Sequence, residues 1–168
     1  MFGITIAKRP HNYRKIDDLV SRSAMPTSAK NIKWLKKQGV TDIVNFRISG
    51  SLEHGGRERE VAEKYGIRYH HIPTDTKHPS ERQVEHFLDI VEGVERKGGK
   101  VHIHCRIGAD RTGMYSWIYK QKHGLGEMSQ NEQEMHCLGH DSTELPMLIN
   151  WVKDYIYKDW GGRPQGRL

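Results

Sequence analysis

Short apolar runs alternate with longer amphipathic segments along most of the chain, and this alternation constrains the fold more than any other feature of the sequence. Strands that alternate with helices predict an α/β domain with a central, mostly parallel sheet flanked by helices. In open sheets of this kind, ligands bind at the carboxyl ends of the strands. The residues directly after each predicted strand are therefore the first candidates for a functional site.

Strands are expected where short apolar runs lie between turn residues, and helices where apolar residues recur every three or four positions. Capping residues and glycines predict where the helices begin and end. The predicted strands are 4–6, 19–21, 41–46, 67–72 and 101–104. The predicted helices run from Thr27 to about Gln38, over about 57–65, from Ser80 to the glycines at 98–99, over about 112–122, and over a last segment that contains Leu145 and Ile156. Three capping boxes are predicted, namely Ser80 with Gln83, Ser129 with Glu132, and Asp141 with Glu144.

The length of 168 residues predicts a single domain over residues 1–168, with residues 1–14 as an N-terminal extension and residues 161–168 as a flexible basic tail. No apolar run approaches the roughly 20 residues that cross a bilayer, so no membrane span is expected. Two cysteines are too few for a disulfide framework. We therefore expect a cytoplasmic protein whose cysteines remain free thiols.

The formal net charge of +6 is unevenly distributed along the chain. Residues 1–40 contain nine Lys or Arg and two Asp, whereas the remainder contains 18 basic and 19 acidic residues. The excess therefore lies in the N-terminal region, where Lys30, Lys33 and Lys37 share one face of a predicted helix. A solvated face is the default interpretation of these lysines, and a docking surface for an acidic partner is the alternative. Nucleic acid is also compatible with this charge, as the weaker alternative for a partner.

One segment between a predicted strand and a predicted helix carries most of the chemistry: His104-Cys105-Arg106-Ile107-Gly108-Ala109-Asp110-Arg111-Thr112-Gly113. A tight loop between Cys105 and Arg111 can turn its backbone N–H groups inward and bind an anion. The helix that follows adds its positive N-terminal end, and Arg111 adds a bidentate guanidinium. The same field favours Cys105 as a thiolate, which is an activated nucleophile beside a bound phosphate. The pattern therefore predicts that residues 106–111 bind phosphate next to a nucleophilic cysteine.

This segment resembles the His-Cys-five residues-Arg-Ser/Thr-Gly signature of the cysteine-dependent protein tyrosine and dual-specificity phosphatases, in their small atypical or bacterial form. Residues 39–47 and 67–80 resemble the early strand and the general-acid loop of these enzymes, so the resemblance covers most of residues 15–157. It implies a tyrosine-phosphatase-like fold, with the phosphate-binding loop between a strand and a helix. It implies neither a metal nor another cofactor.

The resemblance also implies a role for each residue of the signature. Cys105 would attack phosphorus and form a phosphocysteine intermediate, while Arg111 would bind the phosphoryl oxygens. The hydroxyl of Thr112 would hydrogen-bond the Cys105 thiolate, and His104 would support the loop. Arg106, directly after the cysteine, would add positive charge at the rim of the site.

A general acid is implied as well, because an alkoxide or phenoxide is a poor leaving group. Asp75 is the best candidate, since it lies on a loop between a strand and a helix, 30 residues before Cys105. A solvated carboxylate in an Asx turn is the alternative for Asp75. Asp110 departs from the family pattern, in which many members carry glycine, and we expect it to point away from a bound dianion into a salt bridge.

The resemblance implies phosphomonoester hydrolysis on a phosphorylated protein, with phosphotyrosine as the first substrate and phosphoserine or phosphothreonine as further ones. The alternative is the same chemistry on a phosphoinositide, an inositol phosphate or the 5′-triphosphate of RNA. A non-catalytic phosphate-binding module is the least favoured function, because Cys105 and Arg111 are both present. The signature alone does not separate these substrates, since it does not encode the depth of the pocket.

Overall fold

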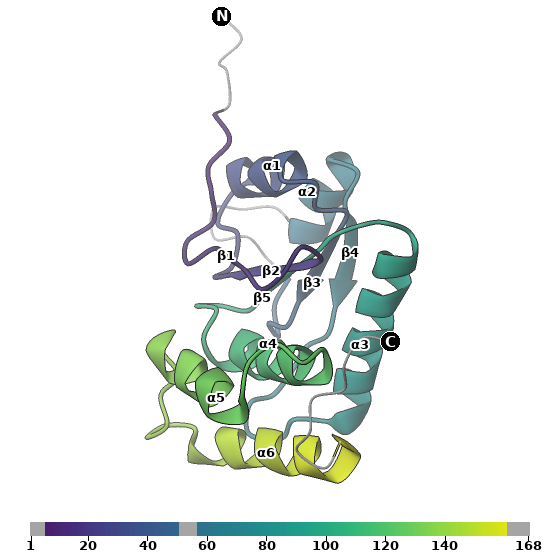
Figure 1. Cartoon of the computed structure of the whole chain (residues 1–168). Coiled ribbons are helices and arrows are strands. Elements are labelled where there is room, and N and C mark those ends of the chain that lie inside the picture. The colour runs from purple at the N-terminus through teal and green to yellow at the C-terminus, as the bar shows by residue number, and fades with distance from the viewer. Residues whose placement is uncertain (1–5, 51–56, 161–168) are drawn as a thin grey trace, which may run out of the picture.

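The computed structural model describes residues 6–50 and 57–160 (Figure 1). It has the α/β class that the sequence predicts. The predicted strand at 4–6 lies partly, and the predicted tail at 161–168 wholly, outside the described residues. In chain order the elements are β1 Arg14–Lys15, β2 Val20–Ser23, α1 Ala29–Lys37, β3 Asp42–Asn45, α2 Glu58–Lys64, β4 Arg68–His71, α3 Glu81–Arg96, β5 Val101–His104, α4 Asp110–Lys122, α5 Met128–Cys137 and α6 Pro146–Trp160.

The strands form one sheet in the order β1-β2-β5-β3-β4. Strands β2, β5, β3 and β4 run parallel, and β1 pairs with β2 in the antiparallel sense. Ser23 and Asn45 both lie beside His104 in the register, and His71 lies beside Asn45. The carboxyl ends of the four parallel strands therefore meet at one edge of the sheet, and β5 is the central strand.

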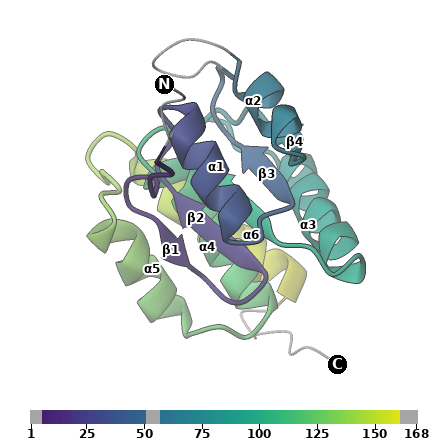
Figure 2. The same cartoon turned by 90° about the horizontal axis from the view of Figure 1, so that it is seen from above.

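Helices cover both faces of this sheet: α1 and α2 lie on one face, and α3 to α6 lie on the other (Figures 1 and 2). Each face has its own hydrophobic core. The core under α1 and α2 contains Ile32, Leu35, Ile43, Ala62 and Ile67, and the larger core on the other face contains Val44, Phe87, Ile103, Trp117 and Val152. Because side chains alternate along a strand, His102 and His104 point towards α1 and α2, whereas Val101 and Ile103 join the larger core.

The predicted capping boxes are wrong, because Gln83, Glu132 and Asp141 bond to other partners. Ser80 precedes α3, but its side chain makes no capping bond, and the amide of Gln83 donates to the carbonyl of Pro73 at 2.7 Å. The box before α5 is formed by Glu127 and Gln130, since Glu132 pairs with Lys153 at 2.8 Å.

Two other predicted helix starts are displaced. Ser28, and not Thr27, precedes α1, and the hydroxyl of Thr27 donates to the side chain of Asn31 at 3.1 Å. The carboxylate of Asp141 accepts the N–H groups of Thr143 and Glu144, but this is a turn, and α6 begins only at Pro146. Asp141 thus stabilises a local turn before α6, whereas Thr27 bonds to Asn31 in the first turn of α1 without preceding the helix directly.

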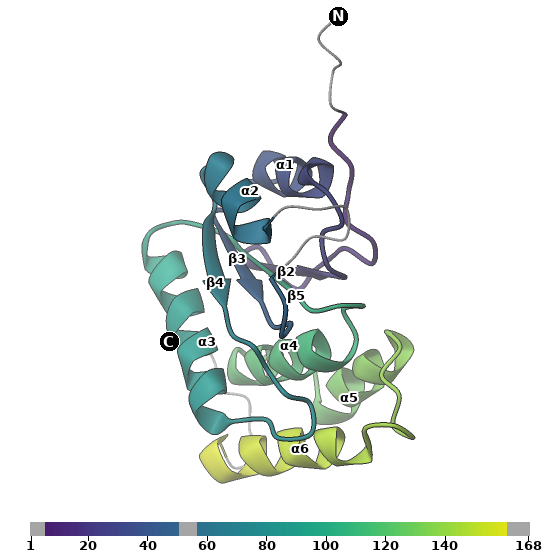
Figure 3. The ribbon, with the colours of Figure 1, turned by 180° about the vertical axis from the view of Figure 1, so that it is seen from behind.

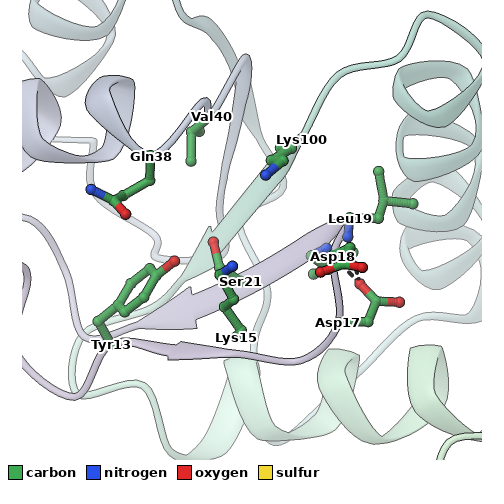
Figure 4. Close-up of a pocket in the computed structure, with 10 residues that line it drawn as sticks. Tyr13, Lys15, Asp17, Asp18, Leu19, Ser21, Gln38, Val40 and Lys100 are labelled. Atoms are coloured by element: carbon green, nitrogen blue, oxygen red, sulfur yellow. Dashed lines mark hydrogen bonds between the residues drawn. The ribbon is translucent and has the colours of Figure 1, made fainter.

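A small pocket lies at the opposite, amino-terminal edge of the parallel strands, between Tyr13, Gln38, Val40 and Lys100 (Figure 4). Its volume is about 10 Å³, which is the space of at most one water molecule. It is too small for a ligand.

Candidate active site

Cys105 follows the last residue of the central strand and stands at the middle of the carboxyl edge of the sheet. It is 2% exposed, so its thiol lies at the bottom of the site rather than on the surface. The chain then turns through Arg106 to Ala109 and enters α4 (Figure 3). This is the strand–loop–helix arrangement that the sequence predicts.

The helix begins earlier than the sequence predicts. Asp110 is already the first residue of α4, and Ala109 precedes it, so Arg111 lies in the first helical turn. The loop from Cys105 to Ala109 is correspondingly short. Its backbone N–H groups and the N-terminal end of a helix of 13 residues lie together, as an anion-binding loop requires.

Gly108 lets this loop turn tightly against the end of β2. Its φ is +83°, in the left-handed region, and a Cβ at this position would lie 2.7 Å from the carbonyl oxygen of Ser23. The N–H of Met25 donates to the carbonyl of Arg106 at 3.0 Å and ties the same two segments together. A side chain at 108 would therefore push the loop away from its support.

Arg22, from β2, is a buried cation beside this loop. The sequence analysis did not single out this residue. It is 2% exposed, donates to the carbonyl of Gly108 at 2.6 Å, and pairs with Glu134 of α5 at 3.2 Å. Burial lowers the pKa of Arg22, while Glu134 and Cys105 oppose that effect through their negative charge.

Arg111 donates to the carbonyl of Phe46, at the end of β3, at 3.5 Å. The N–H of Thr74 donates to the same carbonyl at 3.2 Å. Thr74 directly precedes Asp75, so one backbone oxygen connects the signature arginine with the base of the predicted acid loop. The hydroxyl of Thr74 donates to Ile72 and accepts from Tyr115 of α4, which holds this base against the helix.

Asp75 itself is exposed on its loop. Its carboxylate accepts the N–H of Lys77 at 2.9 Å and pairs with His78 at 3.1 Å. These two bonds lower its pKa below the ordinary value. In this structure Asp75 is thus held as a carboxylate in a local turn, which is the alternative that the sequence analysis left open beside the acid role.

Two further residues of the signature have distinctive surroundings. Asp110 bonds to the buried Nδ1 of His140 at 2.6 Å, so it is paired, as the sequence analysis expects. The buried Oγ1 of Thr112 has no hydrogen-bond partner among the described residues, so the expected bond to the Cys105 thiolate is not formed. A buried hydroxyl without a partner lowers the stability of the folded state, and it can still donate a hydrogen bond to a group that enters the site.

His104 supports the loop through a carboxylate that the sequence analysis missed. Its Nε2 bonds to Glu58 of α2 at 2.5 Å, and its Nδ1 contacts the carbonyl of Cys105 at 3.2 Å. Both side chains are fully buried. No signal in the sequence distinguishes Glu58, because it lies in a run of charged residues that is typical of a solvated helix.

The rim of the site combines positive and apolar side chains. Arg106 and Ile107 are exposed on the loop, Ile107 by 48%. A cavity of about 250 Å³ lies at the carboxyl end of β4, and its lining residues are Gly50, Arg57, Arg59, Tyr69 and His71. The imidazole of His71 donates to the carbonyl of Arg47, while His70 bonds to Asp42, so the two histidines point apart as predicted.

Two negative findings apply to residues 6–50 and 57–160. No group of three or more His, Cys, Asp or Glu side chains in these ranges is arranged to hold a metal ion. No helix in the described part of the chain is long and apolar enough to cross a membrane. Cys105 is buried and Cys137 exposed, and both are free.

Solved structures with this arrangement of sheet, loop and helices are phosphatases of the tyrosine-phosphatase fold. TpbA of P. aeruginosa has a TM-score of 0.71 and 21% identity, over 92% of each chain. The core catalytic domain of the PP-IP phosphatase SIW14 of S. cerevisiae has a TM-score of 0.68 and 14% identity, over 91% of this chain and 95% of the other. A DUF442 protein of Shewanella putrefaciens CN-32 has a TM-score of 0.74 and 21% identity, over 89% of this chain and 92% of the other.

These similarities establish the fold of the chain, and the match to a family model establishes the family to which it belongs. The family described as "Polymorphic toxin system, DSP-PTPase phosphatase" matches residues 20–124, a range that runs from β2 through the whole signature segment into α4. The chain belongs to this family of phosphatases. The resemblance to tyrosine and dual-specificity phosphatases that the signature predicts is thereby confirmed.

Proposed function

We propose that the protein hydrolyses phosphomonoesters through a phosphocysteine intermediate, with Cys105 as the nucleophile. The observation that carries this proposal is the meeting of three parts at one sheet edge. Cys105 directly follows the central strand, and Arg111 lies in the first turn of α4. Arg111 and the N–H of Thr74, at the base of the Asp75 loop, both donate to the carbonyl of Phe46. This arrangement supports a nucleophile and an oxyanion ligand for one phosphoryl group, with the loop that carries the proposed acid anchored beside them.

In the first step the Cys105 thiolate attacks phosphorus, and the bond between phosphorus and the ester oxygen breaks. The leaving oxygen takes its proton from Asp75. In the second step a water molecule attacks phosphorus and gives a proton to Asp75, while the bond between phosphorus and sulfur breaks. Inorganic phosphate leaves, and the thiolate and the protonated acid are both restored.

The surroundings of Cys105 support the nucleophilic role. Arg22 is a buried cation beside it, and the end of α4 and the loop N–H groups add positive potential. The unpartnered hydroxyl of Thr112 is available to donate to the sulfur when it carries negative charge, as it does when the phosphocysteine breaks down.

The acid role of Asp75 requires a rearrangement of its side chain. As long as Lys77 and His78 donate to the carboxylate, it stays ionised and has no proton to give. We propose that binding of a phosphorylated substrate at Arg111 draws Asp75 out of this turn. Thr74, which is held by Phe46, Ile72 and Tyr115, is the fixed point about which the loop moves.

A phosphotyrosine-bearing protein is the proposed substrate, with phosphoserine and phosphothreonine as further ones. The exposed Ile107 offers an apolar contact for an aromatic ring at the rim, and Arg106 offers a charge for acidic flanking residues. A cysteine-to-serine variant of TpbA, at 20% identity and a TM-score of 0.70, has been solved in complex with pTyr. That likeness supports the proposal only through the shared fold.

A substrate with several phosphates is the second candidate. The cavity beside β4 is lined by Arg57, Arg59 and His71, two strands away from Cys105 in the sheet. Neighbouring strands are about 4.8 Å apart, so this cavity lies roughly 10 Å from the central strand, within the span of an inositol polyphosphate. SIW14, a PP-IP phosphatase, has the same fold.

The decisive experiment compares the unmodified chain with Cys105→Ser and Asp75→Asn. We expect vanadate-sensitive hydrolysis of p-nitrophenyl phosphate, and no turnover for Cys105→Ser although phosphate still binds. Asp75→Asn should slow alkyl phosphates much more than p-nitrophenyl phosphate, because a good leaving group needs no proton. Turnover by Cys105→Ser would overturn the mechanism, and equal slowing of both esters would remove Asp75 from the acid role.

A substrate panel separates the two candidates. It contains a phosphotyrosine peptide, a phosphothreonine peptide, a phosphoinositide, inositol hexakisphosphate and 5′-triphosphate RNA, all at one salt concentration. The proposal predicts the highest kcat/KM for the phosphotyrosine peptide. A preference for the inositol phosphate that disappears in Arg59→Gln would favour the second candidate instead.

A further inference from the structure

His140 follows α5, outside the signature segment, and its imidazole is buried against the start of α4. The side chain is 0% exposed, and its Nδ1 lies 2.6 Å from a carboxylate oxygen of Asp110, the first residue of α4. Its buried Nε2 has no hydrogen-bond partner among the described residues. The bond to Asp110 is therefore the one hydrogen bond of this ring within the described part of the chain.

The end of α5 fixes the backbone of His140. Gly139 follows the last turn of α5 with a φ of +101°, in the left-handed region. Its N–H donates to the carbonyl of His136 at 3.0 Å, and the N–H of His140 donates to the carbonyl of Met135 at 3.1 Å. These two bonds form a Schellman motif, in which glycine is the preferred residue at the left-handed position. Backbone hydrogen bonds thus determine where the chain places the imidazole.

α5 is itself fixed against α4 and β2. Glu134 of α5 pairs with Lys120 of α4 at 2.6 Å and with the buried Arg22 of β2 at 3.2 Å. Met135 packs so closely on α4 that a Cβ at Gly113 would lie 2.8 Å from its side chain. The turn that carries the histidine is therefore held at a fixed place beside the first turn of α4.

The start of α4 has no side-chain cap. Ala109 precedes the helix, and its side chain cannot accept a hydrogen bond from the N–H groups of the first turn. Together with the N–H groups of the loop, these are the donors that an anion requires. A carboxylate in the first turn is attracted by the same positive helix end. An unrestrained Asp110 carboxylate would therefore repel a phosphate dianion and compete with it for these donors.

The surroundings of His140 determine where its hydrogen lies. An ionised carboxylate can only accept, so Nδ1 donates to Asp110. A hydrogen on Nε2 would be a buried donor without an acceptor among the described residues, which is unfavourable. The ring thus fits the form with its hydrogen on Nδ1, and this N–H holds the carboxylate beside the turn that follows α5.

We propose that His140 is a positioning residue, whose Nδ1–H holds the Asp110 carboxylate towards α5 and so leaves the uncapped start of α4 to the phosphoryl group. The proposal rests on the proposed function for the place where phosphate binds. It concerns binding and not the chemical step, so it is testable without turnover.

The first test measures how inorganic phosphate protects Cys105 from alkylation by iodoacetamide at neutral pH. The parent is the full chain with Cys137→Ser, in which Cys105 is the one cysteine. His140→Leu and His140→Asn have the same branching and both shorten the ring, but only asparagine can donate to Asp110 from the place of Nδ1. We expect the phosphate concentration for half protection to rise about 3- to 10-fold in His140→Leu and less than about 2-fold in His140→Asn.

The same two substitutions in an Asp110→Asn chain are the matched control. Asparagine has no charge that repels a dianion, so there His140→Leu should change the half-protecting concentration by less than about 2-fold. An equal rise in both backgrounds would show a merely structural loss and overturn the proposal. Equal binding by His140→Leu and His140→Asn in the parent background would overturn it as well. If Cys105→Ser retained turnover while these expected differences were found, the proposed function would fail and the role of His140 in binding would stand.

The second test needs no phosphate. Nitrogen-15 NMR of the unmodified chain at neutral pH reports which ring nitrogen of His140 carries hydrogen, and His140→Asn assigns the signals. We expect hydrogen on Nδ1. A ring with hydrogen on Nε2 and none on Nδ1 would overturn the proposal, even if His140→Leu did not fold.

Discussion

Replacing Gly108 by alanine should damage the phosphate-binding loop far more than an alanine in an ordinary left-handed turn. Gly98, at the turn between α3 and β5, provides the comparison. Its φ is +69°, close to the +83° of Gly108, but a Cβ there would meet nothing within 4 Å. At Gly108 the Cβ would lie 2.7 Å from the carbonyl oxygen of Ser23 and 2.9 Å from the backbone nitrogen of Ala24.

The two substitutions share one cost and differ in another. A left-handed alanine costs about 1–2 kcal/mol at either position. Contact with backbone atoms, which cannot rotate away, adds about 1–3 kcal/mol at Gly108. For a chain of this size about 1 kcal/mol lowers Tm by about 2–4 °C. Gly108→Ala should therefore unfold about 2–12 °C below Gly98→Ala.

The loop can also relieve the contact by moving, and then activity falls. A displacement of 1 Å in an active site can cost about 100-fold, so a shift of a few tenths of an ångström should reduce kcat/KM by about 3- to 10-fold. Thermal unfolding by circular dichroism and steady-state hydrolysis of p-nitrophenyl phosphate measure the two effects. Equal Tm and equal activity for the two alanine variants would refute the close approach of the loop to β2.

Three more substitutions test other contacts. Asp42→Asn should lower the free energy of unfolding by about 1–3 kcal/mol at pH 7. Burial raises the pKa of Asp42, but hydrogen bonds from His70 and Arg68 outweigh this effect and hold the pKa well below its ordinary value. The stability that the Asp42 carboxylate contributes is therefore complete above about pH 4 and is lost as the pH falls further. Urea unfolding at pH 7 and pH 3 checks this, and an unchanged difference between the two chains would contradict it. Arg22→Met should lower Tm and slow alkylation of the buried thiol at pH 6, because it removes the donor to Gly108 and the nearby charge; unaltered alkylation would exclude the second effect. Tyr115→Phe removes the hydroxyl that donates to Thr74 and should lower the free energy of unfolding by about 1 kcal/mol. It should also slow the hydrolysis of alkyl phosphates more than that of p-nitrophenyl phosphate. Equal slowing of both esters would contradict the role of Thr74 as the anchor of the Asp75 loop.

The sequence predicted best what short-range patterns determine. β5 covers Val101–His104 as predicted, because a short segment of alternating β-branched residues between two glycines and a tight loop has few alternatives. Every apolar residue of the predicted stripe in α3, from Val84 to Val94, is buried. The order of strand, loop and helix around Cys105 follows from the same local signals.

Contacts between distant segments were not predictable in this way. Arg22 and Gly108 are 86 residues apart in sequence, and Glu58 and His104 are 46 apart. Nothing in the local pattern around either charged residue distinguishes it from a solvated one. The capping boxes failed for a related reason: Glu132 gains more from Lys153 in another helix than from the start of its own.

The position of β5 at the centre of the sheet has a consequence for how the chain folds. Its partners are β2, 81 positions earlier, and β3, 59 positions earlier, so its two pairings close long loops. Until residue 104 is available, β2 and β3 have no strand between them, and only the pairing of β3 with β4 can form in the parallel part of the sheet. Long-range parallel pairing is slow, because the entropy of loop closure is lost before the contacts are gained. The step that completes the sheet is also the step that buries Cys105, so the nucleophile forms its site late in folding, and partly folded chains should expose it as an ordinary thiol.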